Sequence, residues 1–259
     1  MEYTKLIRLQ DLVNNPSARV PVCLCLDTSD SMAFVDDETN VVRTGQFVYR
    51  DGVRCEVIQG GGETRLQAMQ AGVAEFYRAL REDEDACDSA EISLVTFDSQ
   101  ARCIQDFGWL GRQTETPRLS TNGETHMGEG VNLALDLLAA RKQEYKDKGV
   151  DYFQPWLVLM TDGCPNGSQA ELERAIERTN ILVSNRKLTV FPIAIGKDAD
   201  MGVLRRFSPN RDPMRLQGLK FREFFQWLGA SVSRTSQSTP GEAVKLDTAG
   251  IKGWGVLYN

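Results

Sequence analysis

The chain has 259 residues, of which 41% are hydrophobic and 25% are charged, and its formal net charge is −6. This is a globular composition, and the length suits one large α/β domain or two small ones. The acidic charge disfavours non-specific binding to nucleic acid, which requires phosphate-neutralising Lys and Arg. No apolar run approaches the ~20 residues that cross a membrane, and residues 1–20 lack the apolar core of a signal peptide. We therefore expect a soluble, cytoplasmic protein that contacts neither membrane nor nucleic acid.

The six cysteines do not suggest a disulfide framework. Such frameworks occur in small secreted chains, whereas this chain is long and has no secretion signal. Cys23 and Cys25 alternate on a predicted strand, and no second Cys/His pair follows at zinc-ligand spacing. We interpret them as small buried thiols.

Strand and helix patterns alternate along the chain. Residues 19–26 are apolar at both alternating sets of positions, which is typical of a strand covered by helices on both faces. Residues 64–82 carry apolar side chains at helical spacing. The later predicted elements are strands over 90–97, 101–107, 155–161, 187–195 and 213–217, and helices over 127–145, 168–185, 199–207 and 220–232. This alternation predicts a Rossmann-like α/β fold, with a mostly parallel sheet between two helical layers.

Two segments stand outside this alternation. Residues 33–62 interrupt the passage from the first strand to the first helix, and Asp51-Gly52 lies between two strand-like runs. Because Asp-Gly favours a two-residue turn, we expect an inserted β-hairpin arm. The domain is expected to span residues 1–232. Residues 233–259 form a tail rich in Ser, Thr and Gly, whose apolar end docks back or onto a partner.

Polar oxygens follow two of the predicted strands and precede one helix. They are two carboxylates and three hydroxyls: Asp27, Ser29, Ser31, Thr125 and Asp162. In open α/β sheets, ligands bind outside the carboxyl ends of the strands, so these side chains are expected at one edge. Such oxygens suit a hard cation, which we expect to be Mg²⁺, or else Mn²⁺ or Ca²⁺. Two carboxylates leave the ion electrophilic, and the helix start near Met127 adds positive potential. The site would thus accept a further carboxylate from a partner protein.

These five positions resemble a known motif. Asp27-x-Ser29-x-Ser31 followed by Thr125 and Asp162 matches the metal-ion-dependent adhesion site (MIDAS) of von Willebrand factor A (VWA) domains, and the likeness extends over about residues 19–232. The segments "RVPVCLCLDTSDSM", "WLVLMTDGCPN" and "VFPIAIGKDADMGVLRRFS" resemble the bacterial TerY-like group. This resemblance implies a cytoplasmic, metal-dependent protein-binding module rather than an enzyme. Relatives are associated with tellurium-resistance and with stress or phage-defence operons, often beside a protein kinase and a metal-dependent phosphatase.

The chain departs from the VWA pattern in two ways. Asp30 stands where the family usually has Gly, although Asp tolerates unusual backbone conformations better than most residues. The 33–62 arm is also longer than the usual link to the first helix. We expect a largely acidic, partner-binding rim around the metal, made of Asp30, Glu124, His126, Glu129 and Cys164.

Other functions compete with this interpretation. A phosphotransferase aspartate at position 27 would need a second acid two residues later, where Ser29 stands. A Ser–His–Asp triad would have to use His126, the sole histidine, without a G-x-S-x-G elbow. No cation is predicted beside Cys164 that would stabilise its thiolate, so we interpret Cys164 as a passive residue. The retained alternative is a metal-dependent phosphate-handling enzyme or a regulatory subunit of a kinase/phosphatase system. A scaffold whose ion only stabilises the strand ends is a third hypothesis.

Overall fold

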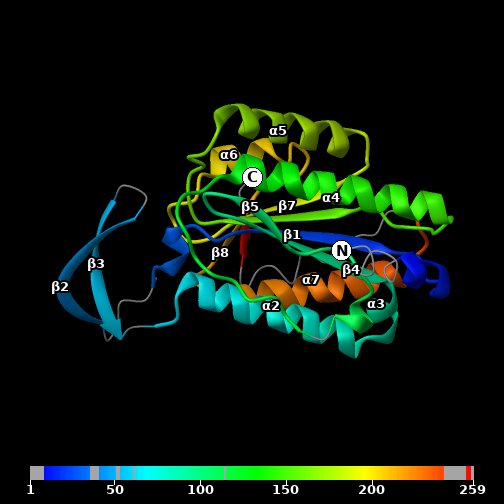
Figure 1. Ribbon diagram of the computed structural model, residues 1–259, viewed down its shortest axis with the longest axis horizontal. Helices are drawn as coiled ribbons and strands as arrows, with labels where there is room; N and C mark the ends of the chain where they lie inside the picture. The colour runs from blue at the N-terminus through cyan, green and yellow to red at the C-terminus, as the bar shows by residue number, and fades with distance from the viewer. Residues whose placement is uncertain are drawn as a thin grey trace.

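Strands form a seven-stranded central sheet and a separate two-stranded sheet in the computed structural model (Figure 1), which describes residues 9–35, 41–50, 53–60, 62–113, 115–241 and 255–257. In these ranges the strands are β1 (Val20–Asp27), β2 (Val41–Arg50), β3 (Val53–Gly60), β4 (Ala90–Phe97), β5 (Ala101–Gln105), β6 (Trp156–Thr161), β7 (Thr189–Ala194), β8 (Met214–Leu216) and β9 (Gly255–Leu257).

The central sheet has the strand order β5-β4-β1-β6-β7-β8-β9. Its five inner strands run parallel, and the two edge strands β5 and β9 are antiparallel to their neighbours. The predicted mostly parallel sheet is therefore confirmed. β1 lies between β4 and β6, and all eight of its residues are buried, as its continuous apolar run indicates.

Helices cover both faces of the sheet (Figure 1). The named helices are α2 (Arg65–Glu82), α3 (Glu84–Ser89), α4 (Met127–Lys148), α5 (Gln169–Ser184), α6 (Met201–Arg206) and α7 (Phe221–Ser236), with two 3₁₀ turns, η1 (Asp30–Ala33) and η2 (Leu110–Arg112). Alternate residues of β1 enter two cores. Leu24 and Leu26 pack with α2 and α7, and Cys23 and Cys25 pack with α4, α5 and α6. Both cysteines are buried as expected, and all six cysteines are free.

The short helix α3 was not predicted. It is a six-residue helix of sequence EDACDS, which is too short to show a helical repeat. The Asp83 side chain starts it by accepting a hydrogen bond of 3.0 Å from the amide of Ala86. No helix in the described ranges is long and apolar enough to span a bilayer.

The predicted hairpin arm is present as the antiparallel pair β2 and β3, which forms the two-stranded sheet. The expected turn at Asp51 and Gly52 lies outside the described residues. At the other end of the chain, β9 pairs with β8 and so adds the last strand to the central sheet. Helix α7 continues to Ser236, past the expected domain boundary at residue 232.

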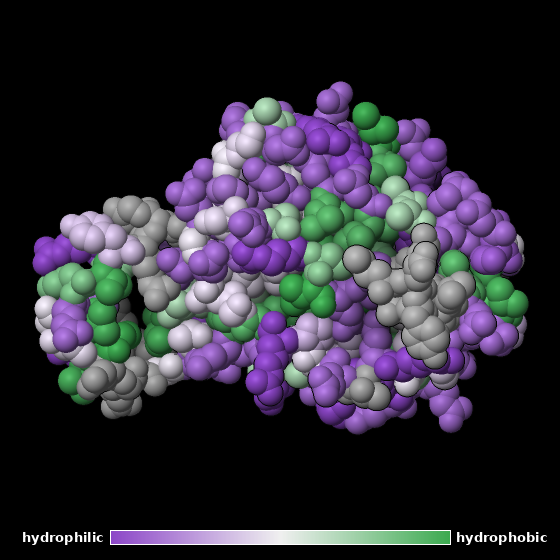
Figure 2. All heavy atoms as spheres, viewed as in Figure 1, coloured by the Kyte–Doolittle hydropathy of each residue, from purple (hydrophilic) through white to green (hydrophobic). Residues whose placement is uncertain are grey.

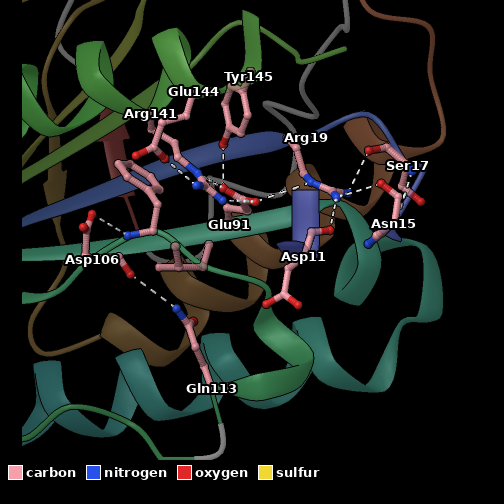
Figure 3. A network of polar contacts seen from close by, with 12 residues as sticks. Asp11, Asn15, Ser17, Arg19, Glu91, Asp106, Gln113, Arg141, Glu144 and Tyr145 are labelled. Atoms are coloured by element: carbon pink, nitrogen blue, oxygen red, sulfur yellow. Dashed lines mark hydrogen bonds and ion pairs between the residues drawn. The ribbon is translucent and has the colours of Figure 1, made fainter. Parts of the chain in front are cut away.

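Figure 3 shows a buried network of charged residues around Glu91. Glu91 lies at the start of β4, whereas the strand-end oxygens lie at the other ends of the parallel strands β1 and β6. The Glu91 carboxylate on β4 accepts hydrogen bonds from Arg141 Nε at 2.6 Å, Arg141 Nη2 at 2.7 Å and the Tyr145 hydroxyl at 2.7 Å. Arg19 Nε lies 3.4 Å from the same carboxylate, and its other nitrogens donate to backbone carbonyls. Burial, and then the negative charge of Glu91, raise the pKa of Tyr145. The network joins α4 to β4 and to the segment preceding β1.

Candidate metal centre

The carboxyl ends of β1 and β6 bring the two predicted carboxylates together. Asp27 is the last residue of β1, and Asp162 directly follows β6, its neighbour in the sheet. Ser29 and Ser31 lie in the turn after β1, and Thr125 lies before the first residue of α4. Four of the five side chains belong to buried residues, and Ser31 is half-buried. Parallel strands thus deliver these residues to one edge, as the sequence predicts.

Hydrogen bonds connect the residues at the end of β1 and in the turn after it with Asp162, which follows β6. The Ser31 hydroxyl donates to Asp162 Oδ1 at 2.7 Å, and Ser31 Oγ lies 3.0 Å from Ser29 Oγ. The Ser29 amide donates to Asp27 Oδ1 at 2.9 Å. Four predicted ligands therefore form one connected cluster of oxygens.

Thr125 approaches the cluster from the α4 side. Its amide donates to Asn166 Oδ1 at 2.6 Å, and the Asn166 amide donates to the Thr125 carbonyl at 3.2 Å. A Cβ atom added to Gly163 would lie 3.5 Å from Thr125 Oγ1, so the hydroxyl lies beside the turn that carries Asp162. Asn166 thus holds Thr125 in place, a role that no pattern in the sequence indicated.

The buried carboxylates repel one another. Burial, and next the nearby charge of Asp162, raise the pKa of Asp27 to about 7. Burial also raises the pKa of Asp162, although Ser31 and Arg65 act against it. A cation between two such groups would relieve this repulsion, and the surrounding hydroxyl oxygens are ligands that Mg²⁺ accepts. The donor set therefore fits a hard divalent cation.

Two residues of the cluster were missed by sequence reasoning. The Thr161 hydroxyl donates to Asp27 Oδ2 at 2.5 Å, and Arg65 Nη1 donates to Asp162 Oδ2 at 2.8 Å. The Arg65 side chain is only 7% exposed. Thr161 adjoins Asp162 in the motif and could have been noticed there. Arg65 begins a helix 97 residues away from its partner, and nothing in its neighbourhood signals the contact.

Asp30 does not require an unusual backbone. It begins the 3₁₀ turn η1, and Arg186 is the one non-glycine residue with positive φ in the described ranges. Asp30 therefore occupies the position where the family usually has Gly without a left-handed backbone. The glycine requirement lies instead at Gly123, whose φ is +60° and whose carbonyl accepts a hydrogen bond of 2.9 Å from the Asp30 amide. Any Cβ at Gly123 would also collide with the Ser99 hydroxyl.

The remaining rim residues lie near the start of α4 and after β6. His126 is the residue before α4; its Nε2 lies 3.3 Å from Glu124 Oε2 and its Nδ1 lies 3.8 Å from Glu129 Oε1. Cys164 is exposed, yet partial burial of its thiol and the nearby charges of Asp200 and Asp198 raise its pKa. A raised pKa favours the thiol over the nucleophilic thiolate, which agrees with a passive role for Cys164.

In the described part of the chain, no group of three or more His, Cys, Asp and Glu side chains is arranged to hold a metal ion. The candidate centre has two carboxylates and completes its oxygens with hydroxyls, so it belongs to a different class of site. Carboxylate and hydroxyl oxygens of this kind are ligands that a hard divalent cation accepts.

The fold and these strand-end residues define a VWA domain. The family model described as the von Willebrand factor type A domain matches residues 22–163, more than half of the chain, and the chain belongs to this family. VWA domains commonly bind proteins through a MIDAS and are typically non-catalytic interaction modules. A search among curated proteins finds no match to the chain.

Solved structures share the fold at low sequence identity. A von Willebrand factor type A protein from Catenulispora acidiphila is 19% identical, with a TM-score of 0.52 over 84% of this chain and 43% of that one. The PilB minor pilin from Streptococcus sanguinis is 14% identical, with a TM-score of 0.57 over 86% of this chain and 64% of that one. In each comparison the chain spans less than two thirds of the other protein, and the likeness concerns the fold alone.

Proposed function

We propose that this protein is a non-enzymatic binding module that uses a divalent cation to bind an acidic group of a partner protein. Asp27, Ser29, Ser31, Thr125 and Asp162 hold the ion, directly or through water. The observation that carries the proposal is the pair of buried, mutually repelling carboxylates surrounded by hydroxyl oxygens.

The charges around the centre favour an anionic partner group. A divalent ion would balance the two carboxylates, and the Arg65 guanidinium, 2.8 Å from Asp162 and 3.8 Å from the more exposed Asp198, places a further positive charge beside the centre. A partner carboxylate offers both the missing charge and an oxygen ligand. The bound ion supplies a Lewis-acidic site for that carboxylate. The rim residues Asp30, Glu124, His126, Glu129 and Cys164 set specificity.

The TerY-like sequence segments extend the proposal. They favour a cytoplasmic bacterial stress-response or defence system of the tellurium-resistance type, in which the partners include a protein kinase and a metal-dependent phosphatase. Mg²⁺ is the proposed ion because it accepts hydroxyl and carboxylate oxygens while retaining water or a foreign ligand.

Metal titration with a matched pair of variants tests the centre. At about a hundredfold excess over its dissociation constant, Mg²⁺ should raise the unfolding temperature by roughly 5–10 °C. Asp27→Asn should abolish the rise. Asp151→Asn, at an exposed residue near the other end of the sheet, should preserve it.

Partner capture in Mg²⁺ and in EDTA separates the functional hypotheses. The proposal requires capture that is lost in EDTA and in Asp27→Asn. Metal-independent capture retained by Asp27→Asn would contradict it. Turnover of a phosphate ester that disappears in Asp27→Asn would instead establish the enzymatic alternative.

A further inference from the structure

A cleft of about 590 Å³ lies between the hairpin arm, formed by β2 and β3, and the body of the domain. Phe34, Val35 and Arg65 line it on the body side, and β3 contributes Val57 and Ile58 on the arm side. Figure 2 shows the surface hollowed between arm and body, and Figure 1 shows β3 on the side of the arm nearer the body. The cleft is therefore bounded by a strand on one side and by residues next to the candidate centre on the other.

The arm exposes apolar side chains that a folded domain ordinarily covers. Four large hydrophobic residues of β2, namely Val42, Phe47, Val48 and Tyr49, are between 41% and 74% exposed. Val48 lines the cleft, whereas Phe47 and Tyr49 point to the opposite face of the strand, because side chains alternate along it. A two-stranded hairpin is at best marginally stable in water. The arm thus has the properties of a surface that a partner covers.

The described residues that line the cleft include more cations than carboxylates, although the chain as a whole is acidic. Among the described residues that line it are three cations, Arg43, Arg65 and Lys197, and a single carboxylate, Glu56. Arg43 Nη1 lies 2.8 Å from Glu56 Oε2, and Arg65 lies 2.8 Å from Asp162 and 3.8 Å from Asp198, so both arginines are locally balanced. The positive charge that the cleft offers a ligand therefore rests on Lys197. Lys197 is exposed and follows β7. A complementary ligand therefore combines acidic with apolar side chains.

Arg65 connects the cleft to the candidate centre. Its side chain lines the cleft, and the same guanidinium donates to Asp162 at 2.8 Å. A ligand lying in the cleft would therefore reach the edge of the sheet where the strand-end oxygens gather.

We propose that this cleft binds an extended segment of a partner protein that carries both acidic and apolar side chains and lies along β3. A strand-like segment fits because the hairpin has open edges in the described residues, and peptides bind such edges through main-chain hydrogen bonds. One carboxylate of the segment points to the metal; this last part rests on the proposed function, whereas recognition by the arm does not.

Two matched pairs of variants test the cleft. Lys197→Glu reverses a charge that lines it, and Lys187→Glu makes the same change at an exposed lysine before the other end of β7. Val48→Ser removes an apolar side chain of the cleft that is 41% exposed. Its control, Ile104→Ser, removes an apolar side chain that is 37% exposed on the edge strand β5, outside the cleft.

The probe is a displayed library of random linear peptides, selected against the full chain in Mg²⁺ and remade as labelled synthetic peptides for fluorescence anisotropy. The expected peptides combine Asp or Glu with apolar residues. Lys197→Glu and Val48→Ser should each weaken their binding at least about tenfold, and the two control variants by less than about twofold.

Several outcomes would overturn the inference: no enriched peptide, peptides without acidic residues, or equal binding by cleft and control variants. A Mg²⁺-independent dimer that Val48→Ser dissociates would assign the arm to a second copy of the chain. Binding to lipid vesicles that Val48→Ser abolishes would assign it to a membrane. Mg²⁺-induced stabilisation, measured on the same variants, reports on the proposed function separately. Stabilisation by Mg²⁺ without peptide binding that depends on the cleft refutes only the proposal for the cleft. Peptide binding that depends on the cleft without stabilisation by Mg²⁺ refutes only the proposal for the metal centre.

Discussion

The hydroxyl of Thr161, the last residue of β6, donates a hydrogen bond of 2.5 Å to Oδ2 of Asp27, the last residue of the neighbouring strand β1. The other oxygen of the same carboxylate accepts the Ser29 amide at 2.9 Å. Both oxygens of Asp27 are therefore oriented before any ligand binds. Groups that orient a metal ligand in this way contribute to affinity without touching the ion.

Thr161→Val should weaken Mg²⁺ binding by about 10–100-fold, because it keeps the shape of the side chain but removes the donor to Asp27. Isothermal titration calorimetry measures the affinity directly. Thr179→Val removes an equally buried hydroxyl from α5 and should leave the affinity unchanged. Equal affinities for the wild-type chain and Thr161→Val would show that Thr161 does not position the carboxylate.

Arg65→Met should lower the unfolding temperature without metal and increase the stabilisation that Mg²⁺ provides. Removing the guanidinium leaves the buried Asp162 carboxylate without its 2.8 Å ion pair, which costs about 3–5 kcal/mol. A divalent ion would then replace the positive charge of the guanidinium, and the guanidinium would no longer repel that ion. Thermal unfolding across a Mg²⁺ series measures both effects.

The control for Arg65 is Arg78→Met on the exposed face of α2, where solvent screens the ion pairs to Glu75 and Glu82, so the unfolding temperature should change far less than in Arg65→Met. A Mg²⁺-induced shift in Arg65→Met that is no larger than in the wild-type chain would argue against competition between guanidinium and metal.

Glu91→Gln should destabilise the fold by about 3–5 kcal/mol, because Arg19 and Arg141 would lose the buried carboxylate that lies between them (Figure 3). Urea unfolding measures this loss. The Mg²⁺-induced stabilisation should persist, since the network lies at the other end of the sheet. Glu82→Gln, at a side chain that is 62% exposed, should cost less than about 1 kcal/mol. A comparable loss in both variants would refute a special role for the network.

Gly128→Ala should cost about 1–3 kcal/mol of folding stability and weaken Mg²⁺ binding. Its new Cβ atom would lie within 2.4 Å of the Leu172 amide nitrogen, so α4 would have to move away from α5, taking the Thr125 loop with it. Gly229→Ala in α7 is the matched control, because its Cβ would meet Ala79 at an ordinary 3.6 Å. Unchanged melting and metal affinity in Gly128→Ala would refute this close packing.

Much of the fold follows from local sequence patterns. The continuous apolar run of β1 and the helical repeat of α2 predict their elements to within two residues. The helix α3 was not predicted, because its six residues cover less than two turns. The pairing of β9 with β8 was not predicted either, since the register of β9 depends on a sheet assembled from distant segments.

The sequence by itself determined which oxygens meet at the candidate centre. Asp27, Ser29, Ser31 and Asp162 follow parallel strands, and parallel strands end at a common edge whatever the details of packing. That these residues hold a metal remains a prediction. Only the tertiary structure decided what surrounds them: the Arg65 ion pair, the Thr161 hydrogen bond and the cleft beside the arm. Those contacts depend on the register of β1 with β6 and on where α2 begins above the sheet, and neither is encoded in the spacing of residues along the chain.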